Sequence, residues 1–415
     1  MFQQLIYDLM IRAYRLAIAI VSPFNGKAGK WISGRRGWRE KLRNNLNTEG
    51  QKVFWVHAAS LGEFEQGRPV IDMMRSEFPQ CKIVLTFFSP SGYEIRKGYD
   101  KVDLVTYLPL DTRSNARDFL TIVNPSVAIF IKYEFWFNHL AELKARSIPV
   151  LLVAGRLHEK QGFFKPWGGF FRKGLSAFEH FFLQDKTSAY LLDELGFKNY
   201  TVNGDTRFDR VLAIQEEDRK FPEIEKFSGG HPTIVVGSSW PYDEILIQKY
   251  IAGKRPGSFK VIFAPHEIDK KRINEFINRS PLPAIRYSDI SNSTGSESVL
   301  FIDSIGMLSH LYRYSTVAMI GGGFGAGIHN TLEAAVWSKP LVFGPRYKMF
   351  REAVDLVENG SAFPVESQME LDEILDKLLF GDSTIRELAG QMAWRYCESG
   401  QGASKQVVQY VSASI

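Results

Sequence analysis

The feature that most limits how this chain can fold is its alternation of short apolar runs with segments of helical period. From about residue 50 onward the apolar runs recur, and each is followed by a helical pattern or a loop. Continuous apolar runs are typical of parallel strands that are buried on both faces. We expect strands at 52–57, 82–89, 104–110, 127–133, 149–155 and 180–184, and a second set at 233–239, 260–266, 299–304, 316–323 and 340–345.

The alternation breaks once, around residues 214–231, where the chain is charged and contains Pro222 and a pair of glycines. Such a stretch is typical of a linker. The simplest architecture is therefore α/β, with two doubly wound, Rossmann-like domains facing each other across a cleft. We predict an N-terminal segment at 1–45, a first domain at 46–215, a linker at 216–231 and a second domain at 232–415, with the last helix free to pack back on the first domain.

Composition fits such a protein and excludes several other classes. The chain has 415 residues, of which 45% are hydrophobic, which is enough apolar material for two or three domains. Its two cysteines, Cys81 and Cys397, lie far apart and outside any CxxC pattern, so neither a disulfide framework nor a cysteine zinc site is indicated. The net charge of +5 is modest, and the basic residues do not alternate with aromatic ones, which argues against nucleic acid as a partner.

The first 45 residues have a different character. Residues 1–24 are apolar but are interrupted by Asp8, Arg12 and Arg15, so the longest uncharged run is too short to cross a bilayer of about 30 Å. Lysines, arginines and two tryptophans follow up to residue 43. Two interpretations fit equally well. One is a helix that lies in the membrane interface beside anionic lipids; the other is an amphipathic core helix followed by a solvated basic loop.

Glu63 is the first candidate site residue. It follows the predicted strand 52–57 and a run of small residues, and it shares the first turn of a predicted helix with Glu65. The favourable interaction of an acidic side chain with the helix dipole is sufficient to explain why Glu65 occurs at this position. Glu63 lies closer to the carboxyl end of the strand, where open parallel sheets keep their ligands. We expect the helix N-terminus to keep Glu63 ionised and to weaken it as a base.

A glycine-rich loop marks the second domain. After strand 316–323 come further glycines, and then a helix is predicted to open near Asn330. Glycines permit close backbone approach, and free N–H groups at a helix start bind phosphate or carboxylate, although a tight turn also needs glycine. No Gly-Lys-Ser/Thr follows, so the loop is not a P-loop. Together with the strand ends "GSSW", "APHE" and "DSIGML", the loop predicts a nucleotide pocket.

The order of seven motifs resembles one enzyme family. The motifs are "HAASLGEFEQGRPVI", "YEFWFN", "AGRL", "GDTRFDR", "GSSW", "DSIGML" and "GIHNTLEAA". They resemble the Kdo transferases, the 3-deoxy-D-manno-octulosonic acid transferases of lipopolysaccharide synthesis, over nearly the whole chain. The resemblance implies a GT-B fold and transfer of Kdo from CMP-Kdo to a lipid A precursor such as lipid IVA. It also implies an inverting reaction without metal or cofactor, at the cytoplasmic face of the inner membrane.

The resemblance also implies roles for individual residues. Glu63 would be the general base, and Glu134 and Arg207, the latter where the family commonly has lysine, would support the transition state. An ion pair between the domains explains Glu134 and Arg207 nearly as well. The residues that would bind the CMP part of the donor are Ala264, Pro265, His266, Ile305, Gly306, Met307, Asn330, Thr331, Leu332 and Glu333.

Three positions depart from the family pattern. "IKYE" lacks the first acid of the family's Glu-Thr-Glu run, Met307 stands in place of a glutamate, and Pro265 stands in place of an arginine. These departures affect contacts to the donor phosphate more than the reaction type. Of the histidines near strand ends, His57 and His266 are expected to be half-buried and structural, and His329 to order the glycine loop.

Two other functions remain open from the residues alone. One is a different GT-B enzyme that uses a UDP-sugar, either a lipid-linked glycosyltransferase or an epimerase. The other is a membrane-bound scaffold without catalytic activity. Protection from thermal unfolding by CMP or by UDP separates the first of these from a Kdo transferase, because a ligand stabilises the state that it binds. A scaffold would be insensitive to replacement of Glu63.

Overall fold

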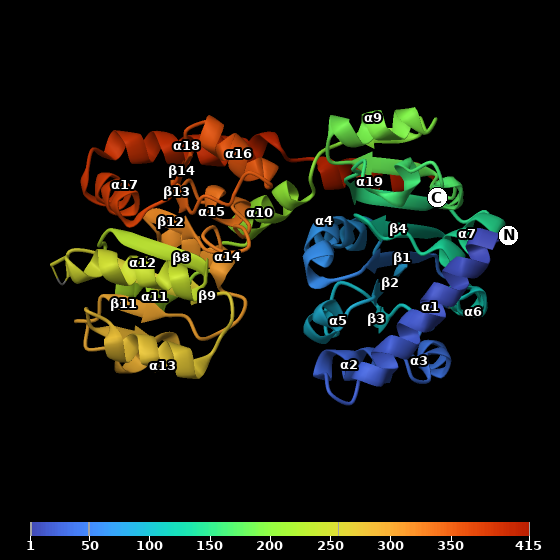
Figure 1. Ribbon diagram of the computed structural model, residues 1–415, viewed down its shortest axis with the longest axis horizontal. Coiled ribbons are helices and arrows are strands. Elements are labelled where there is room, and N and C mark those ends of the chain that lie inside the picture. The colour runs from blue at the N-terminus through green and yellow to red at the C-terminus, as the bar shows by residue number, and fades with distance from the viewer. Residues whose placement is uncertain (1, 49, 256, 415) are drawn as a thin grey trace. The chain divides into compact units, whose positions relative to one another are not determined.

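The computed structural model describes residues 2–48, 50–255 and 257–414, which form two compact units (Figure 1). Unit 1 contains the chain up to Arg210 together with the residues from Gln401 onward, and unit 2 runs from Val211 to Gly400. The segment 216–231, for which the sequence predicts a linker, contains the short helix α11 (Pro222–Ser228), whose Ile224 is fully buried. Each unit has its own parallel sheet, as the apolar runs predict.

The sheet of unit 1 has seven parallel strands in the order β3-β2-β1-β4-β5-β6-β7. The strands are β1 (Val53–Ala58), β2 (Lys82–Phe87), β3 (Leu104–Tyr107), β4 (Val127–Ile131), β5 (Val150–Gly155), β6 (His180–Leu183) and β7 (Tyr200–Val202). The first six coincide with the predicted runs, apart from β1, which extends one residue beyond its run, whereas β7 was not predicted. Strand order reverses between β1 and β4, so their carboxyl ends form the switch point at which doubly wound sheets bind ligands.

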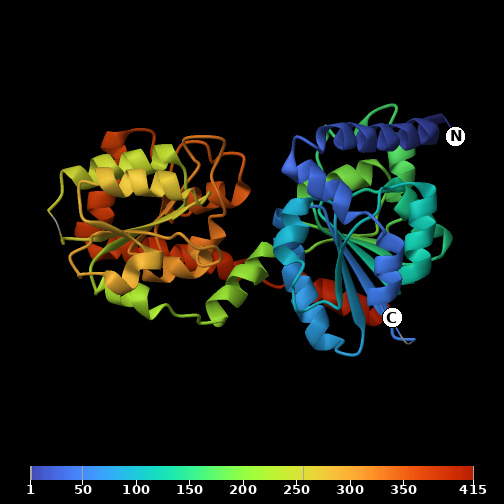
Figure 2. The ribbon, with the colours of Figure 1, turned by 90° about the horizontal axis from the view of Figure 1, so that it is seen from below.

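Helices cover both faces of this sheet (Figure 2). They are α1 (Phe2–Val21), α2 (Gly26–Gly34), α3 (Trp38–Asn45), α4 (Leu61–Glu77), α5 (Pro90–Arg96), α6 (Arg113–Val123), α7 (Phe137–Ala145), α8 (Gly169–Leu175), α9 (Lys186–Glu194) and α19 (Ala403–Ser414). The boundary between the two units falls within the next helix, α10 (Arg207–Glu216). Trp55 is central to the core on one face. On the other face, Val407, Val408 and Val411 of α19 join a core cluster with Phe64 of α4. The last helix is therefore part of unit 1.

Unit 2 repeats the architecture with strand order β10-β11-β9-β8-β12-β13-β14. Its strands are β8 (Thr233–Ser239), β9 (Lys260–Pro265), β10 (Ala284–Arg286), β11 (Val299–Phe301), β12 (Val317–Ile320), β13 (Leu341–Phe343) and β14 (Ala362–Pro364). Its helices, besides α11, are α12 (Pro241–Ala252), α13 (Lys270–Arg279), α14 (Leu308–Leu311), α15 (Leu332–Ala335), α16 (Arg351–Glu358), α17 (Gln368–Phe380) and α18 (Ser383–Ser399). Here the order reverses between β8 and β12.

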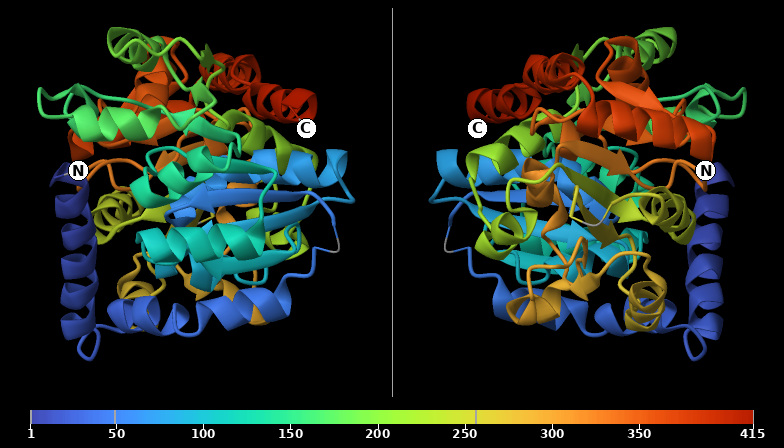
Figure 3. Two further views of the ribbon diagram at one scale, coloured as in Figure 1. Left: turned by 90° about the vertical axis from the view of Figure 1, so that its right-hand side faces the viewer. Right: turned by 90° about the vertical axis from the view of Figure 1, so that its left-hand side faces the viewer.

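Helix α1 runs along one side of unit 1 (Figure 3) and is fastened to it by polar contacts. The Tyr7 hydroxyl donates to Oδ2 of the fully buried Asp111 at 2.5 Å, and Gln4 donates to Asn138 at 3.1 Å. The opposite face of α1 is apolar and exposed: Leu9 is 67% and Ile20 65% exposed. Residues 27–43 lie in helices α2 and α3 and in the turn 35–37 between them, so the basic segment is mainly helical and not a loop.

No helix in the described ranges combines the length and the apolar character needed to cross a bilayer. Helix α1 thus combines parts of the two interpretations that the sequence left open. It packs on unit 1 as an integral helix, and it also leaves an apolar strip uncovered.

Candidate functional site

Glu63 lies in the first turn of α4, directly beyond the carboxyl end of β1. Its Oε2 accepts hydrogen bonds from the backbone N–H of Ser60 at 3.0 Å and from the Ser60 hydroxyl at 3.3 Å, which closes a capping box. Burial, reinforced by the charge of Glu134, raises the pKa of Glu63 to about 7 in spite of these hydrogen bonds. The expectation that the helix N-terminus would weaken this base was therefore wrong, because desolvation outweighs the helix start.

Glu134 lies across the switch point, in the loop between β4 and α7, and is held by two side chains. The indole Nε1 of Trp136 donates to Glu134 Oε2 at 2.8 Å, and Nε2 of His57 lies 3.3 Å from the same oxygen. His57 is fully buried, not half-buried, and its Nδ1 lies 2.8 Å from the Thr86 hydroxyl. Burial lowers the pKa of His57, so the neutral imidazole is favoured. The partners recorded for Glu134 are thus within unit 1.

Arg207 is the first residue of α10, and it forms an ion pair with Asp205, two residues earlier in the chain. Its Nη2 and Nε lie 2.7 Å and 2.9 Å from Asp205 Oδ2, and its backbone N–H donates to Oδ1 of the same carboxylate. Asp205 follows β7, so Arg207 belongs to the same carboxyl edge of the sheet as Glu63 and Glu134. The structure therefore brings the three predicted catalytic residues to one edge of unit 1.

Lys132 is a further candidate site residue, which the motifs do not single out. It follows β4, has a backbone φ of +69°, and stands where the family pattern has the first acid of Glu-Thr-Glu. Burial lowers its pKa, the charge of Arg207 adds to that effect, and the charges of Asp205 and Glu63 oppose it. Lys132 thus interacts electrostatically with both Glu63 and Arg207. A non-glycine residue with positive φ at a strand end is a recognised mark of a functional site, but sequence alone does not reveal it.

In unit 2 several backbone N–H groups of the glycine loop donate hydrogen bonds to other groups of the protein. The Gly322 N–H donates to the buried Asp243 carboxylate at 2.9 Å, and the Gly325 and Gly327 N–H groups donate to the Gly322 carbonyl at 2.9 Å and 3.2 Å. Close packing explains two further glycines: a Cβ at Gly321 would lie 2.3 Å from the Ser238 carbonyl oxygen, and one at Gly323 would lie 2.6 Å from the Gly344 nitrogen. The N–H groups of Gly322, Gly325 and Gly327 are therefore already hydrogen-bonded within the protein.

The helix predicted to open near Asn330 is α15, which begins at Leu332 and has four residues. Its dipole is correspondingly small. Asn330 organises the turn, since its Oδ1 accepts from the Leu332 N–H at 3.2 Å and its Nδ2 donates to Glu333 Oε1 at 3.0 Å. Leu332 and Thr331 are fully buried, and the Thr331 hydroxyl has no hydrogen-bond partner among the described residues.

The other predicted donor residues follow neighbouring strands of the same sheet. After β11 come Ile305, which is 88% exposed, Gly306, with a φ of +88°, and Met307, which is buried and accepts a hydrogen bond from the Ser304 hydroxyl. Ala264 and Pro265 end β9. Since β11, β9, β8 and β12 are adjacent in the sheet, these residues and the glycine loop share one edge of unit 2.

Three aromatic rings stack at this edge. His266 lies with its ring centroid 4.8 Å from Trp240 and 4.4 Å from His329, and the Trp240 indole donates to His329 Nε2 at 3.0 Å. His266 is exposed, contrary to expectation, whereas the His329 N–H bonds the Gly321 carbonyl and so orders the loop. Burial lowers the pKa of His329 to about 4. Trp240 belongs to the motif "GSSW", but its contact with His329 does not follow from the sequence.

Among the residues that the structure describes, no three His, Cys, Asp or Glu side chains converge into a group that could hold a metal ion. The functional groups at the two edges are instead carboxylates and cations in unit 1, and stacked rings with a tightly packed glycine loop in unit 2.

Comparisons with known proteins show which proteins this chain resembles. Residues 35–210 match the family model described as 3-deoxy-D-manno-octulosonic-acid transferase (Kdo transferase). The 3-deoxy-D-manno-octulosonic acid transferase of Rickettsia felis is 25% identical over 372 residues, which are 87% of this chain and 79% of that protein. A bifunctional glycosyltransferase/methyltransferase of Fusobacterium nucleatum is 25% identical over 83% of the chain, and this chain spans about half, 54%, of that relative's length.

Among solved structures, the UDP-GlcNAc 2-epimerase of Neisseria meningitidis, bound to UDP-GlcNAc, superposes with a TM-score of 0.60. The match covers 88% of this chain and all of the epimerase chain at 16% sequence identity, so it shows the fold alone. It supports the GT-B type for the two parallel-sheet units. The resemblance seen in the motifs is thus confirmed: residues 35–210 match the Kdo-transferase family model, and the chain is similar to 3-deoxy-D-manno-octulosonic acid transferases along most of its length.

Proposed function

We propose that this protein transfers Kdo from CMP-Kdo to a lipid A precursor of the lipid IVA type, with inversion at the anomeric carbon and without a metal. The observation that carries the proposal is the position of Glu63. It is a half-buried carboxylate at the carboxyl end of β1, electrostatically coupled to Glu134 across the switch point, in a chain related to Kdo transferases. The cations Lys132 and Arg207 support charge that develops at the same edge.

The chemistry needs one base and one leaving group. The oxygen of an acceptor hydroxyl forms a bond to the anomeric carbon of Kdo while the bond from that carbon to the CMP phosphate breaks. CMP leaves with the electron pair, and the hydroxyl proton passes to the Glu63 carboxylate. A general base of this kind contributes roughly 10²–10⁴-fold, and it works best when its pKa lies near the working pH. A pKa of about 7 meets that condition better than the ordinary value for glutamate.

The raised pKa of Glu63 predicts a specific pH dependence. Only the deprotonated carboxylate can accept a proton, so kcat/KM should rise with pH, pass its midpoint near the Glu63 pKa of about 7, and then level off. Initial rates of Kdo transfer at subsaturating CMP-Kdo, measured in buffers of constant ionic strength, provide the profile. A rate that is already constant at pH values well below 7 would assign the base to a group with an ordinary carboxylate pKa.

Glu333 is proposed to bind the ribose hydroxyls of CMP, with the backbone near Asn330 close to the phosphate. The Asn330 amide fixes Glu333 Oε1, which orients the carboxylate. Glu333→Ala should weaken CMP binding by about ten- to a hundredfold, since a charge-assisted hydrogen bond is worth about 1.5–3 kcal/mol. Calorimetric titration with CMP measures this, and Glu358→Ala, at an exposed position in α16, is the control. Equal affinities in the two variants would remove Glu333 from the site.

The decisive test of the function is a transfer assay followed by mass spectrometry, in which CMP-Kdo and a lipid A precursor are supplied and added Kdo units are counted. Thermal unfolding with CMP and with UDP accompanies it. Stabilisation by CMP alone supports the proposal, because a ligand at a hundred times its Kd adds about 2.7 kcal/mol. Stabilisation by UDP alone would indicate an enzyme that acts on a UDP-sugar, and an absence of transfer with intact membrane binding would indicate a scaffold.

We place the protein at the cytoplasmic face of the inner membrane, held there by residues 1–45. The exposed apolar side chains of α1 and the basic residues of α2 and α3 support this location. Apolar side chains gain by entering the headgroup region, and each basic residue near an anionic leaflet adds about 1 kcal/mol.

A further inference from the structure

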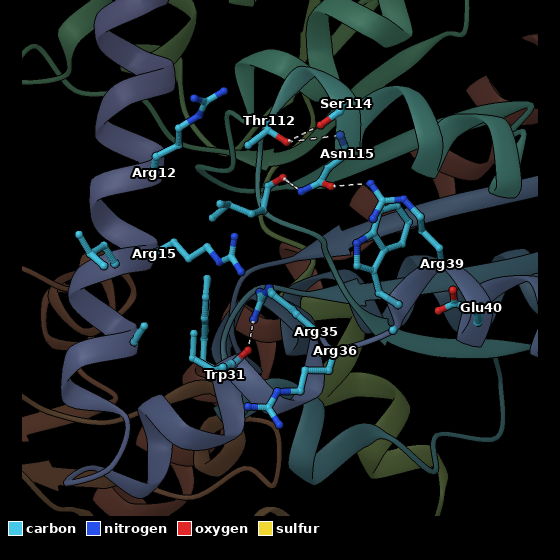
Figure 4. A pocket seen from close by; sticks show the side chains of 16 residues that line it. Arg12, Arg15, Trp31, Arg35, Arg36, Arg39, Glu40, Thr112, Ser114 and Asn115 are labelled. Atoms are coloured by element: carbon cyan, nitrogen blue, oxygen red, sulfur yellow. Dashed lines mark hydrogen bonds between the residues drawn. The ribbon is translucent and has the colours of Figure 1, made fainter.

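Unit 1 contains a cavity of about 960 Å³ that none of the proposed catalytic residues lines. Its walls are α1, the turn from α2 into α3, and the start of α6 (Figure 4). Five arginines line it, namely Arg12, Arg15, Arg35, Arg36 and Arg39. In Figure 4, Arg15 extends from α1 toward Arg35, and Arg39 reaches Asn115 on the other side. We call this space the arginine cavity.

Five of the described residues that line the arginine cavity are arginines and one, Glu40, is acidic, so positive charge exceeds negative charge there. Arg39 bonds the Asp118 carboxylate at 2.7 Å. The Arg35 guanidinium instead donates to the neutral backbone carbonyls of Leu108, Trp31 and Phe88, at 2.9, 3.1 and 2.8 Å.

Within the described parts of the chain, no carboxylate forms an ion pair with the side chains of Arg12, Arg15 or Arg36. Burial lowers the pKa of Arg35 to about 9, which reflects the cost of keeping a charge there. Like charges that line one cavity repel one another, so an anion would stabilise the cluster.

The start of α6 adds a further positive element to the arginine cavity. Thr112 is the N-cap of this 11-residue helix, and Thr112, Ser114 and Asn115 all line the cavity. The first turn of α6 contains no acidic residue that would offset the helix dipole. A helix N-terminus together with several guanidinium groups is the set of donors that binds phosphate.

A second, mainly apolar space shares Trp31 as a lining residue with the arginine cavity. This groove of about 450 Å³ is lined by Tyr14, Ala17, Ile18 and Val21 of α1, and by Trp31 and Phe88. Trp31 lines both spaces, and the Arg35 guanidinium lies 3.9 Å from its ring centroid. A polar anion site and a hydrocarbon groove thus share one wall, next to the exposed apolar strip of α1.

We propose that the two spaces form one lipid site, in which the arginines bind a phosphate monoester and the groove receives an acyl chain of the same molecule. A free phosphate would occupy the arginine cavity and leave the groove without a ligand, so the pairing favours a membrane lipid. The site borders the catalytic edge: Phe88 packs on Trp136 with centroids 4.5 Å apart, and Trp136 donates to Glu134. The inference deepens the membrane location given under the proposed function, but it does not depend on Kdo transfer.

The test is cosedimentation of the full chain with vesicles. Phosphatidylcholine vesicles alone are compared with vesicles that contain phosphatidic acid, a lipid phosphate monoester, or phosphatidylglycerol, a diester, at equal surface charge. We expect the protein to bind phosphatidic acid vesicles most strongly. The double variant Arg12→Gln/Arg15→Gln should lose about 30-fold in binding, since each basic residue contributes about fivefold at the membrane surface. Both arginines are exposed, so the fold should be preserved.

Two controls keep the proposal open to failure. Lys160→Gln/Lys173→Gln removes two exposed charges of unit 1 that do not line the cavity, and should change binding to phosphatidic acid much less. An equal loss in both double variants would mean general charge attraction and would overturn the site. Ala17→Trp, which fills the groove from an exposed position on α1, should reduce vesicle binding several-fold.

Full release of the protein by millimolar inorganic phosphate, with no effect of Ala17→Trp, would show a phosphate site without a lipid and would likewise overturn the proposal. The lipid site is tested by vesicle binding, and Kdo transfer is tested by a separate assay. A negative result in either experiment therefore does not decide the outcome of the other.

Discussion

Glu63→Gln should reduce the turnover number for Kdo transfer by roughly 10²-fold or more, while CMP affinity stays unchanged. Glutamine keeps the shape of the side chain and can still accept the Ser60 hydrogen bond that closes the capping box. It cannot take up the proton of the acceptor hydroxyl. The measurement is the initial rate at saturating CMP-Kdo and acceptor, together with calorimetry for CMP. Nearly normal turnover would exclude Glu63 as the base, and Glu134 would then be the next residue to replace.

Glu65→Gln is the matched control, because Glu65 lies in the same helical turn. Its carboxylate pairs with Arg96 at 2.6 Å and with Arg68 at 3.7 Å, and it is about one-third exposed. Loss of partly exposed ion pairs should cost about 1 kcal/mol or less in stability and should leave turnover within a few-fold. A similar fall in turnover for both variants would point to a disturbed helix start instead of a lost base.

The difference in unfolding stability between Glu63→Gln and wild type is a second measurement, and the raised pKa of Glu63 predicts its sign. The pKa of Glu63 is raised from 4.5 to about 7 in the folded protein, so the native state holds this proton more tightly than the unfolded chain does. Wild-type stability therefore falls, relative to the glutamine variant, as pH rises from about 4.5 to about 7, and the difference is constant above that range. The variant should melt at a higher temperature than wild type at pH 8, which is the opposite of what loss of a structural contact would produce.

Asp111→Ala should lower the free energy of unfolding by about 3–5 kcal/mol, the cost of breaking a buried polar cluster. Asp111 is fully buried at the end of the loop that precedes α6, and its carboxylate is an acceptor for four groups. They are the Tyr7 hydroxyl, His139 Nδ1, and the backbone N–H groups of Asn138 and His139. Alanine leaves these donors buried without an acceptor, and it releases the polar contact that fastens α1 to unit 1.

Equilibrium unfolding in urea, monitored by tryptophan fluorescence, measures this loss. Asp118→Ala is the control, because Asp118 is 39% exposed and bonds Arg39 near the surface. It should cost about 1 kcal/mol or less. If Asp111→Ala proved as mild as Asp118→Ala, α1 would be held mainly by its apolar contacts with Trp31 and Phe88.

The strands that could be predicted from the sequence are those with long apolar runs, and the strands that were missed have a common physical reason. β7, β10 and β14 are three residues long and lie at the edges of the sheets. Most of their residues are partly exposed, so they lack the continuous apolar run of a buried parallel strand. These strands form because they pair with a neighbouring strand, and the local sequence does not show that pairing.

At the candidate site, the sequence predicted where the residues lie in the fold better than it predicted their pKa values and contacts. It placed Glu63 at a strand end correctly, but its pKa depends on burial and on Glu134, which lies 71 positions further along the chain. The role of Lys132 depends on a left-handed backbone and on charges from three other segments. Likewise, the glycines after β12 predict a tight turn, yet the buried carboxylate of Asp243 that occupies the Gly322 N–H comes from a different element.

The discontinuity of unit 1 sets an order for its folding during synthesis. Helix α19 leaves the ribosome after every residue of unit 2, yet Val407, Val408 and Val411 are needed to complete the core beside α4. Unit 2 is continuous in sequence and can close while the chain is still being made. Until α19 docks, the apolar surface around Phe64 and Val70 stays uncovered, so the nascent protein passes through a stage in which unit 1 is the one that needs protection from aggregation.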